Sequence, residues 1–208
     1  MEFRNLDGGE DMKRETYLIK VLTPLHVGAG QGLSHIDLPI IRETYTGFPF
    51  IPGSSVKGCI REHFIKELAK EAGVEPSKID EALHNGKIEK LAKVFGTAGE
   101  SAEGGFGGAG KVSFTDARIL FFPVKSLKGI FQLITCPYVI NRYLEDIKDS
   151  NRLNIDLPEG KALVYSNNFL VEGKILLEEF VFEAEENEKL EEVIKSMPLD
   201  EYQKNRVV

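Results

Sequence analysis

The residues of this sequence that are best suited to chemistry lie in one segment, between Pro24 and Arg61. The segment reads PLHVGAGQGLSHIDLPIIRETYTGFPFIPGSSVKGCIR. Its glycines allow the backbone to approach a ligand closely, and two histidines, an aspartate and a Ser-Ser-Val-Lys run stand among them. This composition indicates a phosphate-bearing partner, together with side chains that can transfer protons.

Asp37 and His26 are the candidate catalytic residues of this segment. An aspartate can bind a metal ion or act as a general base on a hydroxyl, but a turn-forming aspartate that hydrogen-bonds the local backbone is commoner. A histidine can act as a general acid or base, or stack on a base or ribose, but a lone histidine is more often structural. The residues by themselves leave both roles open.

A helix start after Pro52 is the candidate anion site. Ser54 is predicted to be the N-cap of a helix that ends at Gly73. The free N–H groups of a first helical turn and the helix dipole favour an anion, and Lys57 and Arg61 lie one turn apart. The alternative is that Ser54 only caps the helix while Lys57 lies in solvent. The GxxxxGK[ST] pattern of a Walker A motif is absent here.

A similar turn recurs later in the chain, where Pro123-Val-Lys-Ser-Leu-Lys-Gly129 resembles Pro52-Gly-Ser-Ser-Val-Lys-Gly58. Both follow an apolar segment that contains phenylalanine, and both present serine and lysine. Chance could produce this echo, or the two turns make two similar phosphate contacts. The second interpretation extends the phosphate-binding prediction to Lys125, Ser126 and Lys128.

The composition predicts one ordinary globular domain. The chain has 208 residues, 42% of them hydrophobic and 28% charged. The net charge of −7 argues against a free-standing nucleic-acid binder, although a local basic groove can exist on an acidic body. No apolar run approaches the roughly 18 residues of a membrane span, and the polar start is unlike a signal peptide, so we expect a cytoplasmic protein with no membrane partner.

The elements that position these residues follow from periodicity and from turn residues. Residues 1–14 are expected to form a flexible leader and residues 15–208 one domain, truncated at its C-terminal end because Asn205-Arg-Val-Val208 reads as the start of a strand. Strands are predicted at 17–23, 111–122, 129–135, 161–166 and 173–182, and helices from Ser54, Pro76, Pro137 and around Leu190. The residues between Pro123 and Lys128 are predicted to form a turn. This order matches an α+β, ferredoxin-like domain with insertions.

Taken together, several of these segments resemble the RAMP superfamily of CRISPR-associated proteins. The resemblance is carried by TPLHVGAG, DLPIIRE, TGFPFIPGSSVKG, the Phe95-Gly96 turn and DARILFFPVKSLKG. It is most similar to the Cas-seven-like backbone subunit of type III-B (Cmr) effector complexes, the fourth Cmr subunit. The resemblance implies a modified ferredoxin-like, RRM-type fold with palm, fingers and thumb.

The resemblance also implies an activity and its partners. Such subunits stack as a helical filament of copies along a guide (CRISPR) RNA, beside other Cmr subunits, and each copy cuts the paired target RNA once. The cut is a metal-dependent attack by a ribose 2′-OH, with Mg²⁺ or Mn²⁺ as the expected cofactor. The family's catalytic, metal-binding aspartate corresponds to Asp37 and its supporting histidine to His26. The RNA-binding positions are Arg42, Ser54, Ser55, Lys57 and Arg61, with Lys125, Ser126 and Lys128 added from the echo.

Three other functions remain open. A related RAMP backbone subunit of a DNA-targeting complex binds guide RNA without cutting, although Asp37 within DLPIIRE favours cutting. A RAMP-type nuclease that processes guide RNA would act without metal, through His26. An unrelated phosphate-binding enzyme is the last alternative, and no nucleotide-binding motif supports it.

Overall fold

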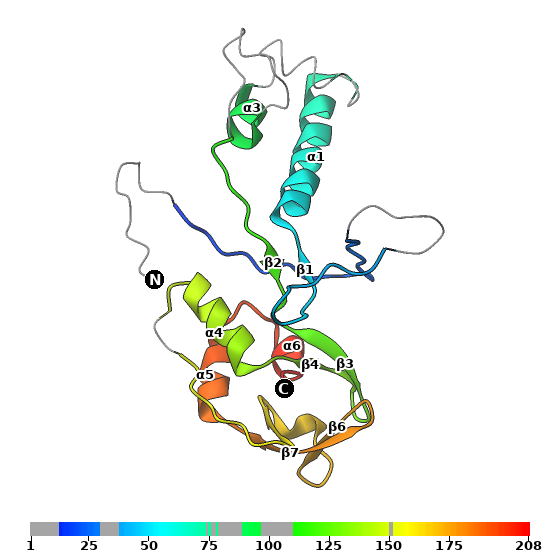
Figure 1. Cartoon of the computed structure of the whole chain (residues 1–208), viewed down its shortest axis with the longest axis vertical. Coiled ribbons are helices and arrows are strands. Elements are labelled where there is room, and N and C mark those ends of the chain that lie inside the picture. Colours follow the sequence, from blue (N-terminus) through cyan, green and yellow to red (C-terminus); the bar gives the residue numbers. More distant parts are fainter. Residues whose placement is uncertain are drawn as a thin grey trace. The chain divides into compact units, whose positions relative to one another are not determined.

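The computed structural model describes residues 13–29, 38–73, 75, 78, 89–96, 110–149 and 152–208. The chain divides into two compact units (Figure 1). One comprises Val21–Arg118, and the other combines Met1–Lys20 with Ile119–Val208. Most of the predicted leader, the start of the helix predicted from Pro76 and the predicted catalytic Asp37 lie outside the described residues.

Among the described residues of the unit Val21–Arg118 are two α-helices and a short strand pair. Strand β1 (Phe50–Ile51) pairs antiparallel with β2 (Ala117–Arg118), and helix α1 (Gly53–Ala72) follows β1 directly. Helix α1 ends at Gly73, as predicted, because glycine accepts the left-handed φ of 63° found there. Ile65 and Ala69 of α1 pack against Leu91 and Phe95 of α3 (Glu89–Phe95). That contact joins the two helices.

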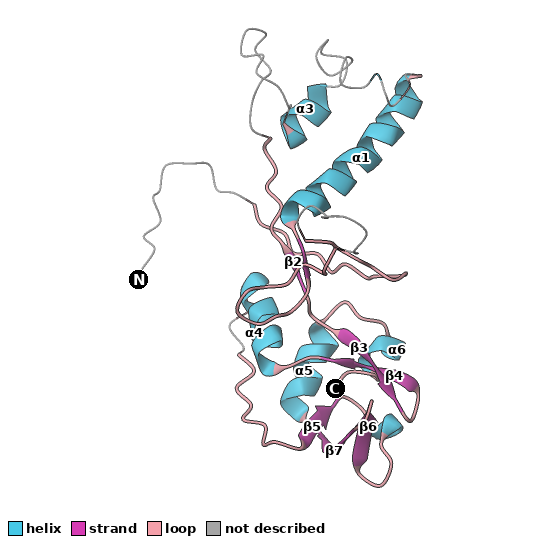
Figure 2. Ribbon diagram, turned by 45° about the vertical axis from the view of Figure 1, so that its right-hand side comes forward, coloured by secondary structure: helices cyan, strands magenta, loops and turns pink. Residues whose placement is uncertain are grey.

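The other unit is built on a curled sheet of five strands. In sequence order these are β3 (Phe122–Ser126), β4 (Ile130–Ile134), β5 (Lys161–Val164), β6 (Lys174–Leu177) and β7 (Phe180–Glu186). Their order in the sheet is β4-β3-β6-β7-β5, and β5 runs parallel to β7 while the other pairs are antiparallel (Figure 2). The mixture of helices and sheet confirms the predicted α+β class.

The last residues of the chain join this sheet. Val207 forms a parallel bridge with Leu133 of β4, and the N–H of Thr135 donates to the carbonyl of Val208 at 2.9 Å. On the other side, the N–H of Tyr165, just past β5, donates to the carbonyl of Val207 at 3.1 Å. Of residues 205–208, which were predicted to begin a strand, the first two form a turn, and only Val207 and Val208 bond as a strand does; these two residues link the two outer strands of the sheet.

Helices α4 (Pro137–Asp146) and α5 (Glu188–Ser196) lie side by side in both views and share a core with the sheet. The pyrrolidine ring of Pro137 suits the first position of a helix, as predicted. Ile140 and Leu144 of α4 meet Leu190 and Ile194 of α5 in one buried cluster. A second cluster, formed by Ala162, Val164, Ile175 and Leu177, fills the opposite side of the sheet. Two further short helices complete this unit, η2 (Asn167–Phe169) and α6 (Glu201–Lys204).

Three strand predictions and one turn prediction were wrong in position. Of the strand predicted at 111–122, only Ala117–Arg118 (β2) and Phe122, the first residue of β3, lie in strands. Residues 17–23 form no ladder with any described residue, and Tyr17 is exposed. The predicted turn at 123–128 is strand β3 as far as Ser126. Pro123 fits within it because β6 pairs with β3 at Ser126 alone, so the missing N–H of the proline costs no ladder bond. The predicted strand at 173–182 is a hairpin of β6 and β7, since Glu178 turns the chain with a φ of 51°.

No helix among the described residues is both long enough and apolar enough to cross a membrane.

Candidate functional site

Two arms of an antiparallel pair flank the segment that contains Asp37. Gly28 bridges to Ile40, the N–H of Ala29 donates to the carbonyl of Pro39 at 2.8 Å, and the N–H of Ile41 donates to the carbonyl of Val27 at 2.8 Å. The arms touch closely, since a Cβ added at Gly28 would lie 2.8 Å from the Cβ of Leu38. A side chain at residue 28 would force the arms apart.

His26 lies on the first arm and is bonded to the second. Its Nε2 lies 2.8 Å from the carbonyl oxygen of Leu38, the residue that follows Asp37. Because a carbonyl oxygen can only accept, Nε2 carries the proton, and in the neutral ring Nδ1 is left as the acceptor. The structure therefore holds the predicted catalytic histidine against the backbone beside the predicted catalytic aspartate. Chemically, an exposed imidazole in this position can act as a general base.

Arg42 closes a tight loop just beyond the second arm. Its Nη1 donates to the carbonyl of Gly47 at 2.9 Å, and Arg42 bridges to Pro49. The N–H of Glu43 donates to the carbonyl of Phe48 at 2.8 Å across the same loop. A guanidinium has five N–H donors, so the exposed Arg42 retains capacity to bind a phosphate while it shapes this loop.

The first turn of α1 is capped differently from the prediction. The N-cap is Pro52, not Ser54, and the N–H groups of Ser55 and Val56 both donate to the carbonyl of Pro52. The N–H of Gly53 donates to Oδ1 of Asp116 at 2.7 Å. A carboxylate is stabilised by the positive end of the helix dipole, so one of the donors expected to bind an external anion already has an anionic partner.

Asp116 is a residue that sequence reasoning missed. It lies immediately before β2, with no local pattern that links it to a helix start more than sixty residues earlier in the chain. Gly53 makes this contact possible, because a Cβ at that position would lie 2.4 Å from the carbonyl oxygen of Phe114. The pairing of β1 with β2 brings the two residues together.

The predicted phosphate-binding residues of α1 lie at its N-terminal end. Ser54 and Ser55 are exposed, and Lys57 and Arg61 are half-buried one turn apart. The neighbouring Glu62 is bonded to Lys66 at 2.6 Å, which lowers the pKa of the Glu62 carboxyl. This arrangement favours a phosphate held by hydroxyls and cations, rather than by the N–H of Gly53.

The second predicted phosphate site belongs to the other unit. The Nζ of Lys128 donates to the carbonyl of Leu170 at 3.2 Å, and the backbone N–H of Lys125 donates to Oε1 of Glu178 at 3.3 Å. Ser126 is only 7% exposed, and its buried hydroxyl has no described partner. Its predicted contact with an external phosphate is therefore disfavoured, because the hydroxyl faces the interior, whereas the side chain of Lys125 is exposed.

The predicted metal site has no preformed cluster of ligands among the described residues. Within the described ranges, no group of three or more His, Cys, Asp or Glu side chains gathers closely enough to hold a metal ion. The predicted ligand Asp37 lies outside those ranges, and Nε2 of His26 is engaged with a carbonyl. A metal at this site would rest on Asp37, completed by substrate phosphate and water.

Comparisons with known proteins agree on one family. A family model described as the RAMP superfamily matches residues 18–202. The chain is 37% identical over 190 residues to the CRISPR system Cmr endoribonuclease Cmr4 of Pyrococcus furiosus, covering 88% of this chain and 58% of that protein. It is 38% identical over 87 residues to the CRISPR system Cms endoribonuclease Csm3 of Enterococcus italicus, covering 40% of this chain and 37% of that protein.

A solved structure is similar over the same range. The crystal structure of oligomeric Cmr4 from Pyrococcus furiosus matches with a TM-score of 0.60 and 32% identity, covering 89% of this chain and 64% of the other. The chain thus spans less than two thirds of the length of these relatives.

Proposed function

The chain belongs to the RAMP superfamily, and from this membership we propose that it is an RNA-cutting backbone subunit of a type III-B CRISPR (Cmr) effector complex. The observation that carries the proposal is the similarity to a Cmr endoribonuclease over most of the chain. The bond between His26 and Leu38 adds local support, because it fixes one candidate catalytic residue against the backbone of the residue that follows the other in the sequence.

The proposed reaction is cleavage of target RNA by its own ribose. The 2′-OH loses its proton and its oxygen attacks the neighbouring phosphorus, while the bond from phosphorus to the 5′ oxygen breaks and that oxygen gains a proton. The products are a 2′,3′-cyclic phosphate and a 5′-OH. Nδ1 of His26 is the acceptor that can take up a proton at this site.

Asp37 is proposed to hold a divalent cation, Mg²⁺ or Mn²⁺, which would stabilise negative charge on the reacting phosphate when bound. Leu38 supports the segment between the two arms by its backbone bond to His26 and by its packing against Gly28.

The RNA is proposed to be bound through its phosphates. Arg42, Lys57 and Arg61, with the hydroxyls of Ser54 and Ser55, form the first contact region. Lys125 and Lys128 form a second. Cations grouped in this way can bind RNA on a chain of net charge −7 because counterion release depends on local phosphate contacts.

The proposed partners are a guide RNA, the complementary target RNA, other Cmr subunits and further copies of this chain in a helical filament. The existence of an oligomeric crystal structure of the similar Cmr4 supports association between copies. The match to Cmr4 favours the Cmr assembly over the Cms assembly of Csm3, since it covers far more of the chain.

The test is target-RNA cleavage by a complex reconstituted with guide RNA. Wild type is compared with Asp37→Ala and His26→Ala, and with exposed controls Asp156→Ala and His63→Ala. Evenly spaced cuts that disappear in Asp37→Ala and in EDTA, while guide binding survives, support the proposal. Cuts that persist in Asp37→Ala would refute the catalytic role of this aspartate.

A second candidate function is favoured by the imidazole geometry. With Nε2 donating to the carbonyl of Leu38, Nδ1 is the acceptor of the neutral ring, and His26 can act as a general base without a metal, as a guide-processing nuclease would require. Cleavage that resists EDTA but is lost in His26→Ala would establish this function instead. Tight guide binding with no cleavage under any condition would identify a non-cutting backbone subunit.

A further inference from the structure

A buried arginine lies behind the turn between β3 and β4. Arg206 is only 8% exposed, and its Nη1 donates to the carbonyl of Gly129 at 2.6 Å and to that of Phe131 at 2.9 Å. Its guanidinium lies over three aromatic rings, 4.9 Å from the centroid of Phe131, 4.7 Å from Phe169 and 4.2 Å from Tyr202. No ion pair joins Arg206 to a carboxylate within the described ranges.

This environment is costly for a charge unless the contacts are kept. A buried cation without a carboxylate partner depends on hydrogen bonds and on the negative faces of aromatic rings. The Nε of Arg206 is buried without a described partner. The cost of burying its charge is therefore offset by the two hydrogen bonds to carbonyls and the three ring contacts. Arg206 is therefore stable in this position only if the turn keeps its present shape.

The shape of the turn is unusual. Gly129 has a φ of 88°, and Ile130, which is β-branched, has a φ of 73°. A β-branched residue adopts this conformation only where its surroundings impose it. A Cβ at Gly129 would lie 2.5 Å from the ring of Phe169 and 3.0 Å from Nη1 of Arg206. The aromatic cage and the guanidinium thus fit directly against the turn.

A second buried side chain binds the same turn. Gln132 is 0% exposed, and its Nε2 donates to the carbonyl of Lys128 at 3.2 Å. The carbonyls of Lys128, Gly129 and Phe131 are thereby all bound by Gln132 or Arg206. These bonds therefore hold the backbone of the turn that contains Lys128 and that follows Lys125 of β3.

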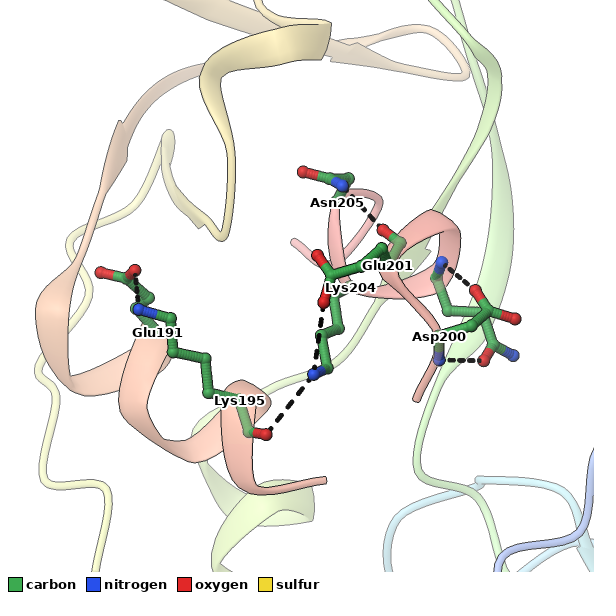
Figure 3. Close-up of polar contacts among 7 residues, drawn as sticks. Glu191, Lys195, Asp200, Glu201, Lys204 and Asn205 are labelled. Atoms are coloured by element: carbon green, nitrogen blue, oxygen red, sulfur yellow. Dashed lines mark hydrogen bonds and ion pairs between the residues drawn. The ribbon is translucent and has the colours of Figure 1, made fainter. Parts of the chain in front are cut away.

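The backbone of Arg206 is itself well anchored. Helix α6 begins with a capping box, in which Asp200 and Gln203 bond reciprocally at 2.7 and 3.1 Å (Figure 3). The Nζ of Lys204 reaches the carbonyl of Lys195 on α5 at 3.5 Å. After α6, the N–H of Leu133 in β4 donates to the carbonyl of Arg206 at 2.8 Å. These bonds fix the backbone of Arg206, and so they fix the position from which its side chain reaches the turn.

We propose that Arg206 is a positioning residue, which holds the β3–β4 turn in the conformation that presents Lys128 of the turn, together with Lys125 near the end of β3, to RNA phosphates. This inference rests on the proposed RNA-binding function. Arg206 does not touch RNA, because it is buried; it acts through the backbone carbonyls of the turn. A lysine at this position would keep the charge but could not bind both carbonyls and stack between the rings.

The experiment measures the affinity of the full chain for a fluorescent single-stranded RNA by anisotropy, over a range of salt concentrations. The double variant Lys125→Ala/Lys128→Ala is expected to weaken binding on the order of tenfold at 0.1 M salt, and to lower the salt slope by about 2. Arg206→Lys is expected to weaken binding by about threefold to tenfold through the same lysines. Combined with the double lysine variant, Arg206→Lys should then have no further effect.

Tyr202→Leu provides a second variant in case Arg206→Lys does not fold. Tyr202 is largely exposed and stacks on Arg206, and Tyr138, which is also exposed and lies 5.4 Å from the guanidinium of Arg142, is the matched control. Tyr202→Leu should weaken RNA binding while Tyr138→Leu should not. Hydrogen exchange of the Leu127 amide, which donates to Leu176, should accelerate in Arg206→Lys and in Tyr202→Leu.

Three results would overturn the inference. Arg206→Lys could leave RNA affinity unchanged while the lysine double variant lowers it, or it could lower affinity equally with and without the two lysines. In either case Arg206 does not act through this turn. If the double lysine variant itself leaves affinity unchanged, the proposed RNA contact of the turn fails, and the positioning role fails with it.

Discussion

At the scale of single residues, two glycines permit the contacts that build the candidate site. Gly28 lets the two arms around Asp37 meet, and Gly53 lets the start of α1 approach the residues before β2. Neither contact needs a left-handed backbone. Each needs the absence of a Cβ, which is why substitutions at these positions should act through displacement of a neighbour.

Gly28→Ala should impair cleavage more than folding. The new Cβ would lie 2.8 Å from the Cβ of Leu38, too close for any rotamer change to relieve, so the arm that begins at Leu38, directly after Asp37 in the sequence, must shift. We expect a loss of target-RNA cleavage on the order of a hundredfold, because displacements near 1 Å have effects of that size. Cleavage by the reconstituted complex measures this loss.

The control for this prediction is Gly58→Ala. A Cβ at Gly58 meets nothing within 4 Å on α1, so this variant should be neutral, or more stable by about 0.5–1 kcal/mol. Equal cleavage by the Gly28 and Gly58 variants would show that the close approach of the arms is not needed.

Asp116→Ala should destabilise the unit Val21–Arg118. It removes the acceptor for the N–H of the buried Gly53, and an unpaired buried donor costs about 1–3 kcal/mol. Asp116→Asn keeps an acceptor oxygen and loses the charge, so it should cost less than Asp116→Ala. Urea denaturation of the three proteins gives the ranking, and equal losses in the two variants would show that the charge at the helix dipole, and not the hydrogen bond to Gly53, dominates.

At the scale of elements, the shared core of α4, α5 and the sheet stabilises the larger unit. Ile194 is 0% exposed and belongs to the same cluster as Ile140 and Leu144. Residues on the outer face of α5 make no such contacts; Glu191 and Lys195 form an exposed ion pair there. Such exposed pairs contribute little to stability.

Ile194→Ala should therefore lower the free energy of unfolding by about 2–5 kcal/mol, through lost burial and a cavity. Lys189→Ala, on the exposed side of the same helix, should change it by no more than about 0.5 kcal/mol. Chemical denaturation followed by far-UV circular dichroism measures both variants. Similar values for the two would mean that α5 does not contribute to the cooperative core.

At the scale of the whole molecule, the acidic balance makes RNA binding depend on a few local cations. A net charge of −7 repels RNA at long range. The salt dependence of the affinity should therefore reflect the number of phosphates that specific lysines and arginines contact. Lys57 and Arg61 are proposed to make such contacts near the start of α1.

Lys57→Ala/Arg61→Ala should lower the slope of log affinity against log salt by about 2, with one unit for each lost phosphate contact. Lys70→Ala, in the last turn of the same helix, should leave the slope unchanged. Titration of guide RNA at several salt concentrations provides the slopes. An unchanged slope in the double variant would remove α1 from the RNA interface.

Much of the architecture could be predicted from local sequence. Gly73 ends α1 and Pro137 begins α4 as expected, because glycine and proline act through their own backbone geometry. The strand β4 and the helix α5 also follow from side-chain periodicity. The resemblance to the RAMP superfamily could likewise be read from short segments of the sequence, and the match of the family model to residues 18–202 confirms that resemblance.

Tertiary structure decided what depends on residues far apart in the chain. Pro123 lies within a strand because the neighbouring strand pairs only at Ser126, and Asp116 caps α1 because β1 and β2 pair. Arg206 is buried behind a turn more than seventy residues earlier. Local propensity acts over a few residues, whereas these contacts depend on strand pairing and burial that no short window of sequence contains.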